Sequence, residues 1–281
     1  MLTQLLEYDF RALNRTMIPL QSGVLLATIV GSLVMRFTLS GISNSSSYFF
    51  TVEDILMVIA RSLTALVFVA VVASSYVTLF LVARHFYQSF FQEDGYLSFT
   101  LPVTAAKSLL SKTIVGWVWL LVNATIIIFG ILFLSLVGFA SEGIYNVLVW
   151  DAYSTVFSYF GDATGIFLII EIIIFGLVTI LSGLLQVFTS LTIGSVVAKT
   201  HKVLAGIGIY IAINIGVSTV VSIVSALFGV GFSNFYIQNQ QYNTLLTAQA
   251  FILPSMLVYG ALVVVFFMLS RHLITTKLNL D

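Results

Sequence analysis

The sequence has few charged residues. Only 8% of its 281 residues are Asp, Glu, Lys or Arg, whereas a soluble domain carries about 25%. A surface with so few charges cannot be mostly in water, and 59% of the residues are hydrophobic. The composition therefore excludes an ordinary soluble protein and indicates one embedded in lipid. The formal net charge is +0, so we expect no nucleic-acid partner.

Cysteine is absent, which excludes disulfides, thiolate catalysis and cysteine-ligated metals but leaves the redox compartment open. The P-loop pattern G-x-x-x-x-G-K-[ST], H-E-x-x-H and G-x-S-x-G are absent as well. Three histidines lie beside Arg or Lys at the ends of predicted spans. Polar residues at the membrane interface are more typical there than metal ligands. The three histidines are His85, His201 and His272. We therefore expect no catalytic, cofactor or metal site, and no enzymatic activity, on this chain.

Long apolar runs dominate what remains. Six of them can each cross a hydrocarbon core of about 30 Å, which takes about 20 helical residues. The runs lack the alternation of apolar and polar residues that is typical of β-barrel spans. A helix, in contrast, satisfies the hydrogen bonds of its own backbone in lipid. The sequence thus predicts an all-α integral membrane protein with a single transmembrane domain over residues 1–281. The expected spans are 17–37, 55–83, 109–137, 165–193, 203–231 and 248–270.

An amphipathic helix is predicted over residues 2–16, before the first span. Leu6, Phe10 and Leu13 recur at spacings of three and four, and charged residues occupy the other faces. This pattern favours an interfacial helix along the membrane over the frayed start of the first span. Because no short apolar run with a small-residue cleavage site follows, we expect no cleaved signal peptide.

Basic residues predict the orientation. Nine of the eleven lie at one side of the expected spans, all except Arg36 and Arg61. That side should be cytoplasmic, which places both termini inside a multi-pass protein of the cell (plasma) membrane. The opposite connection over 138–164 should contain short helical pieces at the membrane interface.

Two charged residues are expected inside the spans, each roughly 9 Å deep from the outer side at 1.5 Å per residue. They are Arg61 in the second span and Glu171 in the fourth. Charges at that depth are costly unless they are paired or hydrated. One hypothesis is an Arg61–Glu171 ion pair, and the alternative is that each side chain faces a water-filled vestibule or an interface.

Small and polar residues form seams on the fourth and fifth spans. The fourth carries glycines such as Gly183 and Gly194 together with Gln186, and the fifth carries Asn214 and Ser218. Close helix packing explains the glycines better than a substrate route does. For Gln186, Asn214 and Ser218, both interpretations remain open. The spans contain no series of carboxylates, which argues against a proton-coupled carrier.

The connection over residues 84–108 carries charges of both signs and many aromatic residues. Phe86 to Phe91 predict a helical extension of the second span, Gly95 breaks it, and Thr104 is an N-cap for the third span. The segment could be only a solvated hairpin. Exposed aromatics beside carboxylates, however, favour a docking surface for a cytoplasmic partner.

The stretch RHFYQSFFQEDGYLSFTLPVTAAKSLLSK (84–112), with YDFRALNRTMIPL near the N-terminus and six spans, resembles the permease subunits of type-2 ABC exporters, in particular Gram-positive ones. The resemblance implies a coupling helix between spans 2 and 3 that sits in a cleft of a separate ATPase. It assigns this coupling role to Phe90, Phe91, Glu93, Asp94, Gly95, Tyr96, Leu101 and Pro102.

The same resemblance implies several partners. Cytoplasmic ABC ATPase subunits would bind ATP and Mg, and a second permease subunit, identical or homologous, would complete the transporter. The exported substrate would be amphipathic, such as a peptide, an antibiotic or a lipid-like molecule. Two alternatives stay open from the residues themselves: a non-transporting sensor or assembly protein that docks a cytoplasmic partner, and, less favoured, a secondary carrier.

Overall fold

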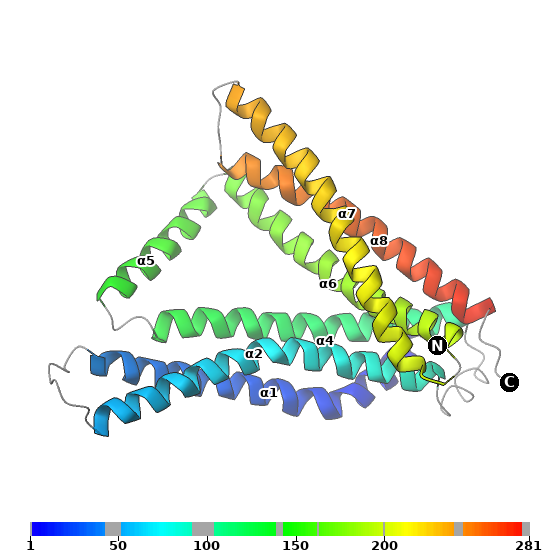
Figure 1. Ribbon diagram of the computed structural model, residues 1–281, viewed down its shortest axis with the longest axis horizontal. Helices are drawn as coiled ribbons and strands as arrows, with labels where there is room; N and C mark the ends of the chain where they lie inside the picture. The colour runs from blue at the N-terminus through cyan, green and yellow to red at the C-terminus, as the bar shows by residue number, and fades with distance from the viewer. Residues whose placement is uncertain are drawn as a thin grey trace. The chain divides into compact units, whose positions relative to one another are not determined.

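The computed structural model describes residues 2–42, 52–91, 104–138, 143–161, 163–198, 200–238 and 244–276. This part of the chain is almost entirely helical and contains no strand (Figure 1). Its α-helices are α1 (Leu2–Ile42), α2 (Val52–Phe91), α4 (Ala105–Phe133), α5 (Gly143–Ser158), α6 (Ala163–Val197), α7 (Lys202–Gln238) and α8 (Thr244–Thr276). A π-helical turn (Leu134–Gly138) follows α4, and a 3-10 turn (Tyr159–Gly161) precedes α6.

Six of these helices are long and apolar enough to cross a membrane, namely all except α5. Their large aliphatic and aromatic side chains are extensively exposed, as lipid-facing surfaces require. The prediction of six helical spans is confirmed, and the chain is a multi-pass membrane protein. The short helical pieces expected within 138–164 are also present, as α5 and the 3-10 turn.

The helices run beyond the predicted spans. Helix α2 has 40 residues, which gives a length of roughly 60 Å, twice the thickness of the hydrocarbon core. Helix α1 continues from Leu2 through the first span without a break, with Pro19 inside it. The amphipathic segment 2–16 is therefore helical and joined directly to the span. Its expected position along the membrane surface stays a prediction.

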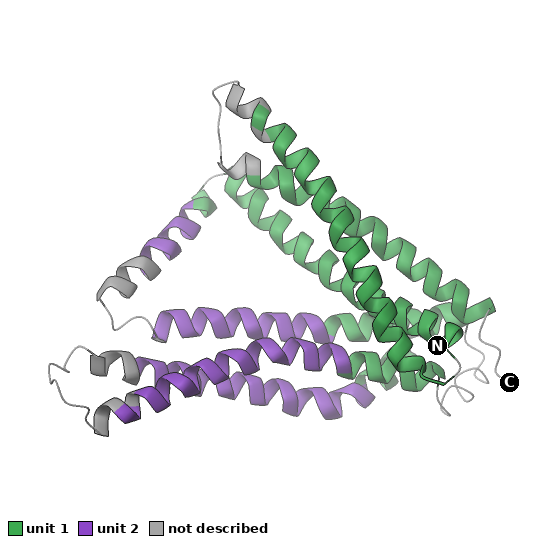
Figure 2. Cartoon of the chain, in the orientation of Figure 1, with its two compact units in different colours: residues 1–10, 81–118, 159–281 green, residues 11–80, 119–158 purple. Residues whose placement is uncertain are grey.

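The backbone groups into two compact units (Figure 2). The first unit comprises residues 1–10, 81–118 and 159–281, and the second comprises 11–80 and 119–158. Helices α1, α2 and α4 each contribute one end to the first unit and the remainder to the second.

In the first unit, α6, α7 and α8 pack against one another. The Thr189 hydroxyl on α6 lies 2.8 Å from the Ser270 hydroxyl and 3.2 Å from the Phe266 carbonyl, both on α8. Gly194 on α6 approaches Gly206 on α7 so closely that a Cβ at Gly194 would lie 2.5 Å from the Gly206 nitrogen. The packing role predicted for Gly194 is thus confirmed.

Helix α6 also contacts the ends of α2 and α4 that belong to the same unit. Phe86 of α2 stacks on Phe188 of α6 with ring centroids 4.0 Å apart, and both rings are fully buried. The Trp117 indole N–H of α4 donates to the Leu177 carbonyl of α6 over 3.1 Å. These contacts fix the end of α2 and the start of α4 on one apolar core.

The second unit is held by a buried amide network between α1, α2 and α4. Asn123 Nδ2 donates to Gln21 Oε1 over 3.1 Å and to Ser74 Oγ over 3.0 Å. Gln21 Nε2 in turn donates to Thr78 Oγ1 over 3.0 Å. All four side chains are buried. In lipid, such interhelical hydrogen bonds replace the hydrophobic driving force that holds helices together in water.

Candidate functional site

The candidate site is the Asp9 cluster, formed by Asp9, His85, Ser111 and Lys112 in the first unit. Lys112 Nζ donates to Asp9 Oδ1 over 3.0 Å, and Ser111 Oγ donates to Asp9 Oδ2 over 2.7 Å. His85 Nε2 lies 3.2 Å from Oδ1. One carboxylate of α1 therefore bonds the end of α2 and the start of α4.

Burial makes this cluster energetically demanding. Asp9 is 1% exposed and Lys112 is 6% exposed, and the Ser111 side chain is fully buried. Taking two charges out of water is repaid only when the geometry is close and the remaining hydrogen-bonding positions are filled. Here both carboxylate oxygens have donors, and the ammonium also lies 5.7 Å from the centroid of the Phe90 ring. The cluster is thus a well-paired structural joint.

Local sequence explains why these charges are buried. Asp9 lies three residues after Leu6 and four before Leu13, so it falls on the apolar stripe of α1. Lys112 lies midway between Leu109 and Val115, which are both fully buried. Sequence reasoning did not single out Asp9 and took His85 for interfacial decoration. The available signal was one acidic and one basic residue, each in phase with an apolar stripe.

The Asp9 cluster lies on the two helices that flank the predicted coupling segment. Helix α2 ends at Phe91 and α4 begins at Ala105, so segment 92–103 starts and ends near helices that both bond Asp9.

The aromatic residues at the end of α2 differ from the expected exposed surface. The helical extension through Phe91 is confirmed, but the expectation of exposure is wrong for Phe86 and Phe90, which are buried. The Phe86 and Phe90 ring centroids are 5.1 Å apart, and Phe86 also stacks on α6. Tyr87 and Phe91 are half-buried. Packing against α6 therefore uses the face of α2 that was assigned to a partner.

The other predicted coupling residues lie outside the described residues. They are Glu93, Asp94, Gly95, Tyr96, Leu101 and Pro102. Their coupling role stays a prediction. The expected helix start is confirmed nearby, because the Thr104 carbonyl accepts from the Lys107 N–H over 2.9 Å and α4 begins at Ala105.

The Arg61–Glu171 pair also stays a prediction, because Arg61 belongs to the second unit and Glu171 to the first. Arg61 is exposed on α2. Glu171 lies on α6, eight residues from its start.

The three residues of the possible substrate route have different surroundings. Gln186 is 4% exposed, and its Nε2 lacks a hydrogen-bond partner within the part of the chain that the structure describes. Asn214 and Ser218 are exposed on α7, and the Ser218 hydroxyl donates to the Ile215 carbonyl of its own helix. The packing role predicted for Gly183 is wrong, because an added Cβ there has no neighbour within 4 Å. Gln186 is therefore buried on α6, whereas Asn214 and Ser218 are exposed on α7.

No known protein family, curated protein or solved structure matches this chain.

Proposed function

We propose that the chain is the permease subunit of an ATP-driven ABC exporter. In this proposal the segment between α2 and α4 is the coupling element, and a separate cytoplasmic ATPase binds ATP and Mg and moves it. The proposal rests on the resemblance of residues 84–112 to the coupling region of type-2 exporter permeases. It also rests on the six spans and on the Asp9 cluster.

The Asp9 cluster is the observation that carries the proposal. A hairpin that only connected two spans would not require a buried ion pair near both of its ends, since such a pair gains little stability over apolar packing. A lever does require a stiff joint, because a soft one would absorb the applied movement. Bonding of Asp9 to both α2 and α4 supplies that stiffness.

The remaining parts of the transporter follow from the same proposal. A second permease subunit, identical or homologous, faces this one, and the cargo is an amphipathic peptide, antibiotic or lipid-like molecule. The chain lies in the plasma membrane, and both of its termini are on the cytoplasmic side. An exporter alternates between an inward-facing and an outward-facing conformation. These two conformations must differ in their affinity for the cargo, because a ligand that binds both equally does not shift the equilibrium between them.

Cross-linking from single cysteines tests the coupling role, and the chain is suited to it because it has no native cysteine. Tyr96→Cys places a thiol in the proposed coupling segment, and Arg271→Cys places one on the exposed side chain at the end of α8. A heterobifunctional cross-linker applied to cells that express each variant should capture a P-loop ATPase from Tyr96→Cys only.

The captured ATPase is then purified with the native chain. Its hydrolysis of ATP should be stimulated by the native chain and lost with the double variant Glu93→Ala, Tyr96→Ala. Capture of a partner that lacks a P-loop would contradict the exporter and favour a sensor or assembly protein. Stimulation that survives the double variant would contradict the coupling assignment.

A further inference from the structure

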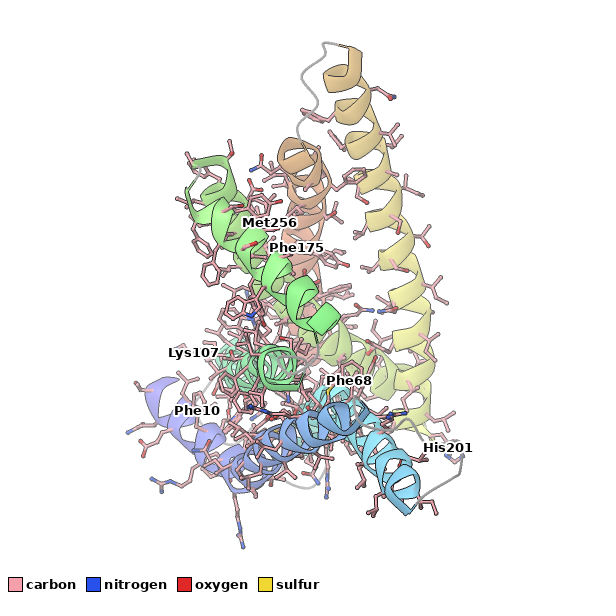
Figure 3. The ribbon with its side chains drawn as sticks, turned by 90° about the vertical axis from the view of Figure 1, so that its left-hand side faces the viewer. Phe10, Phe68, Lys107, Phe175, His201 and Met256 are labelled. Carbon is pink, nitrogen blue, oxygen red and sulfur yellow. The ribbon has the colours of Figure 1, made fainter. Side chains whose placement is uncertain are left out.

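A groove with a volume of about 400 Å³ lies where α7 begins, in the first unit. Its polar end is formed by Tyr87 of α2 and by Thr200, His201 and Lys202 before and at the start of α7. Its apolar end is formed by Val203, Leu204 and Ile207. Figure 3 labels His201 at this turn. Along the chain, the lining is therefore polar up to Lys202 and apolar from Val203 onward.

The polar end suits an anion. Lys202 carries a positive charge there and the His201 imidazole adds a hydrogen-bonding group, while no carboxylate is among the described residues that line the groove. The hydroxyl groups of Thr200 and Tyr87 add hydrogen-bond donors. The N–H groups of the first turn of α7 reinforce this preference.

The apolar end continues as a stripe along the membrane-spanning part of α7. Leu204, Ile207, Ile211 and Ile215 recur at spacings of three and four and are between 53% and 73% exposed. The candidate span begins at Lys202, so a lipid beside α7 would meet the polar residues with its headgroup and the stripe with an acyl chain.

We propose that this groove binds an anionic phospholipid, with the phosphate at His201 and Lys202 and one acyl chain along the α7 stripe. Charge complementarity selects the headgroup, since basic pockets at helix ends bind anionic headgroups. The continuous stripe selects a lipid over a free phosphate, because a free anion would gain nothing from Leu204 and Ile207. This inference is independent of the proposed exporter function.

Native mass spectrometry of the full chain in detergent tests the proposal. The chain is titrated with dioleoyl phosphatidylglycerol, with dioleoyl phosphatidylcholine and with inorganic phosphate. We expect saturable binding of phosphatidylglycerol only. Lys202→Gln should weaken that binding about fivefold, the effect of about 1 kcal/mol per basic residue.

Lys107→Gln is the matched control, because Lys107 is exposed at the start of α4 and does not line the groove (Figure 3). It should bind phosphatidylglycerol as the native chain does. Ile207→Asn should weaken phosphatidylglycerol binding as well, which separates a lipid from a free anion. Equal loss in Lys202→Gln and Lys107→Gln, equal binding of both lipids, or saturable binding of inorganic phosphate would each overturn the proposal.

Discussion

At the scale of single residues, Asp9 and Lys112 show how a membrane protein uses a buried charge pair. Either charge would be strongly destabilising if it were buried alone. Here Lys112, Ser111 and His85 together provide partners for both carboxylate oxygens of Asp9. Removal of one partner should therefore cost far more than replacement of both by apolar side chains.

Lys112→Met should lower the free energy of unfolding by about 3–5 kcal/mol, because it leaves the Asp9 carboxylate without its closest cation. The double variant Asp9→Leu, Lys112→Met should be more stable than Lys112→Met alone. Thermal unfolding of the detergent-solubilised chain measures both variants. Losses that simply add in the double variant would show that the two side chains do not act as a pair.

Asn123 supports the second residue-scale prediction. Asn123→Leu removes the donor to Gln21 and Ser74 and should cost about 1–2 kcal/mol, the range for interhelical hydrogen bonds in model membrane peptides. Asn214→Leu, at an exposed position on α7, is the matched control and should leave the unfolding temperature unchanged. The network would carry no stability if both variants unfolded at the temperature of the native chain.

At the scale of helices, the α6–α7 contact depends on backbone approach. A Cβ at Gly194 would meet backbone atoms of Gly206 at 2.5 and 2.6 Å, and backbone cannot rotate away. Gly194→Ala should therefore destabilise the chain by about 1–3 kcal/mol, as overpacking does. Thermal unfolding in detergent provides the measurement.

Gly183→Ala provides the control on the same helix, because an added Cβ has no neighbour within 4 Å there. It should be neutral or slightly stabilising, since alanine favours helix more than glycine does. If Gly183→Ala lowered the stability as much as Gly194→Ala, α6 would be sensitive to substitution in general. The loss in Gly194→Ala could then not be assigned to the contact with Gly206.

Sequence patterns predicted the helices better than the contacts between them. Apolar runs identified all six spans, because lipid demands about 20 apolar residues of every helix that crosses it. The helical extension of α2 to Phe91 was predictable, but the burial of Phe86 and Phe90 was not, since aromatic residues suit water, a core or a partner. The Asp9 bonds join residues up to 103 positions apart, and no local pattern specifies such a pair.

At the scale of the whole molecule, the distribution of basic residues predicts which side of the membrane each connection occupies. Thr276→Cys at the end of α8 should react with a membrane-impermeant maleimide only after cells are opened. Ser154→Cys on α5 should react in intact cells. Both side chains are exposed, so accessibility alone does not distinguish them. The reverse labelling pattern would invert the topology and place the coupling segment outside the cell.

ATP hydrolysis by the assembled complex tests the central claim, that the Asp9 cluster transmits force between the coupling segment and the spans. Asp9→Asn keeps the shape and one acceptor but removes the charge that Lys112 binds. The variant should still co-purify with the ATPase captured at Tyr96, while its stimulation of ATP hydrolysis should fall toward the rate of the ATPase alone. Full stimulation by an intact Asp9→Asn complex would contradict the account.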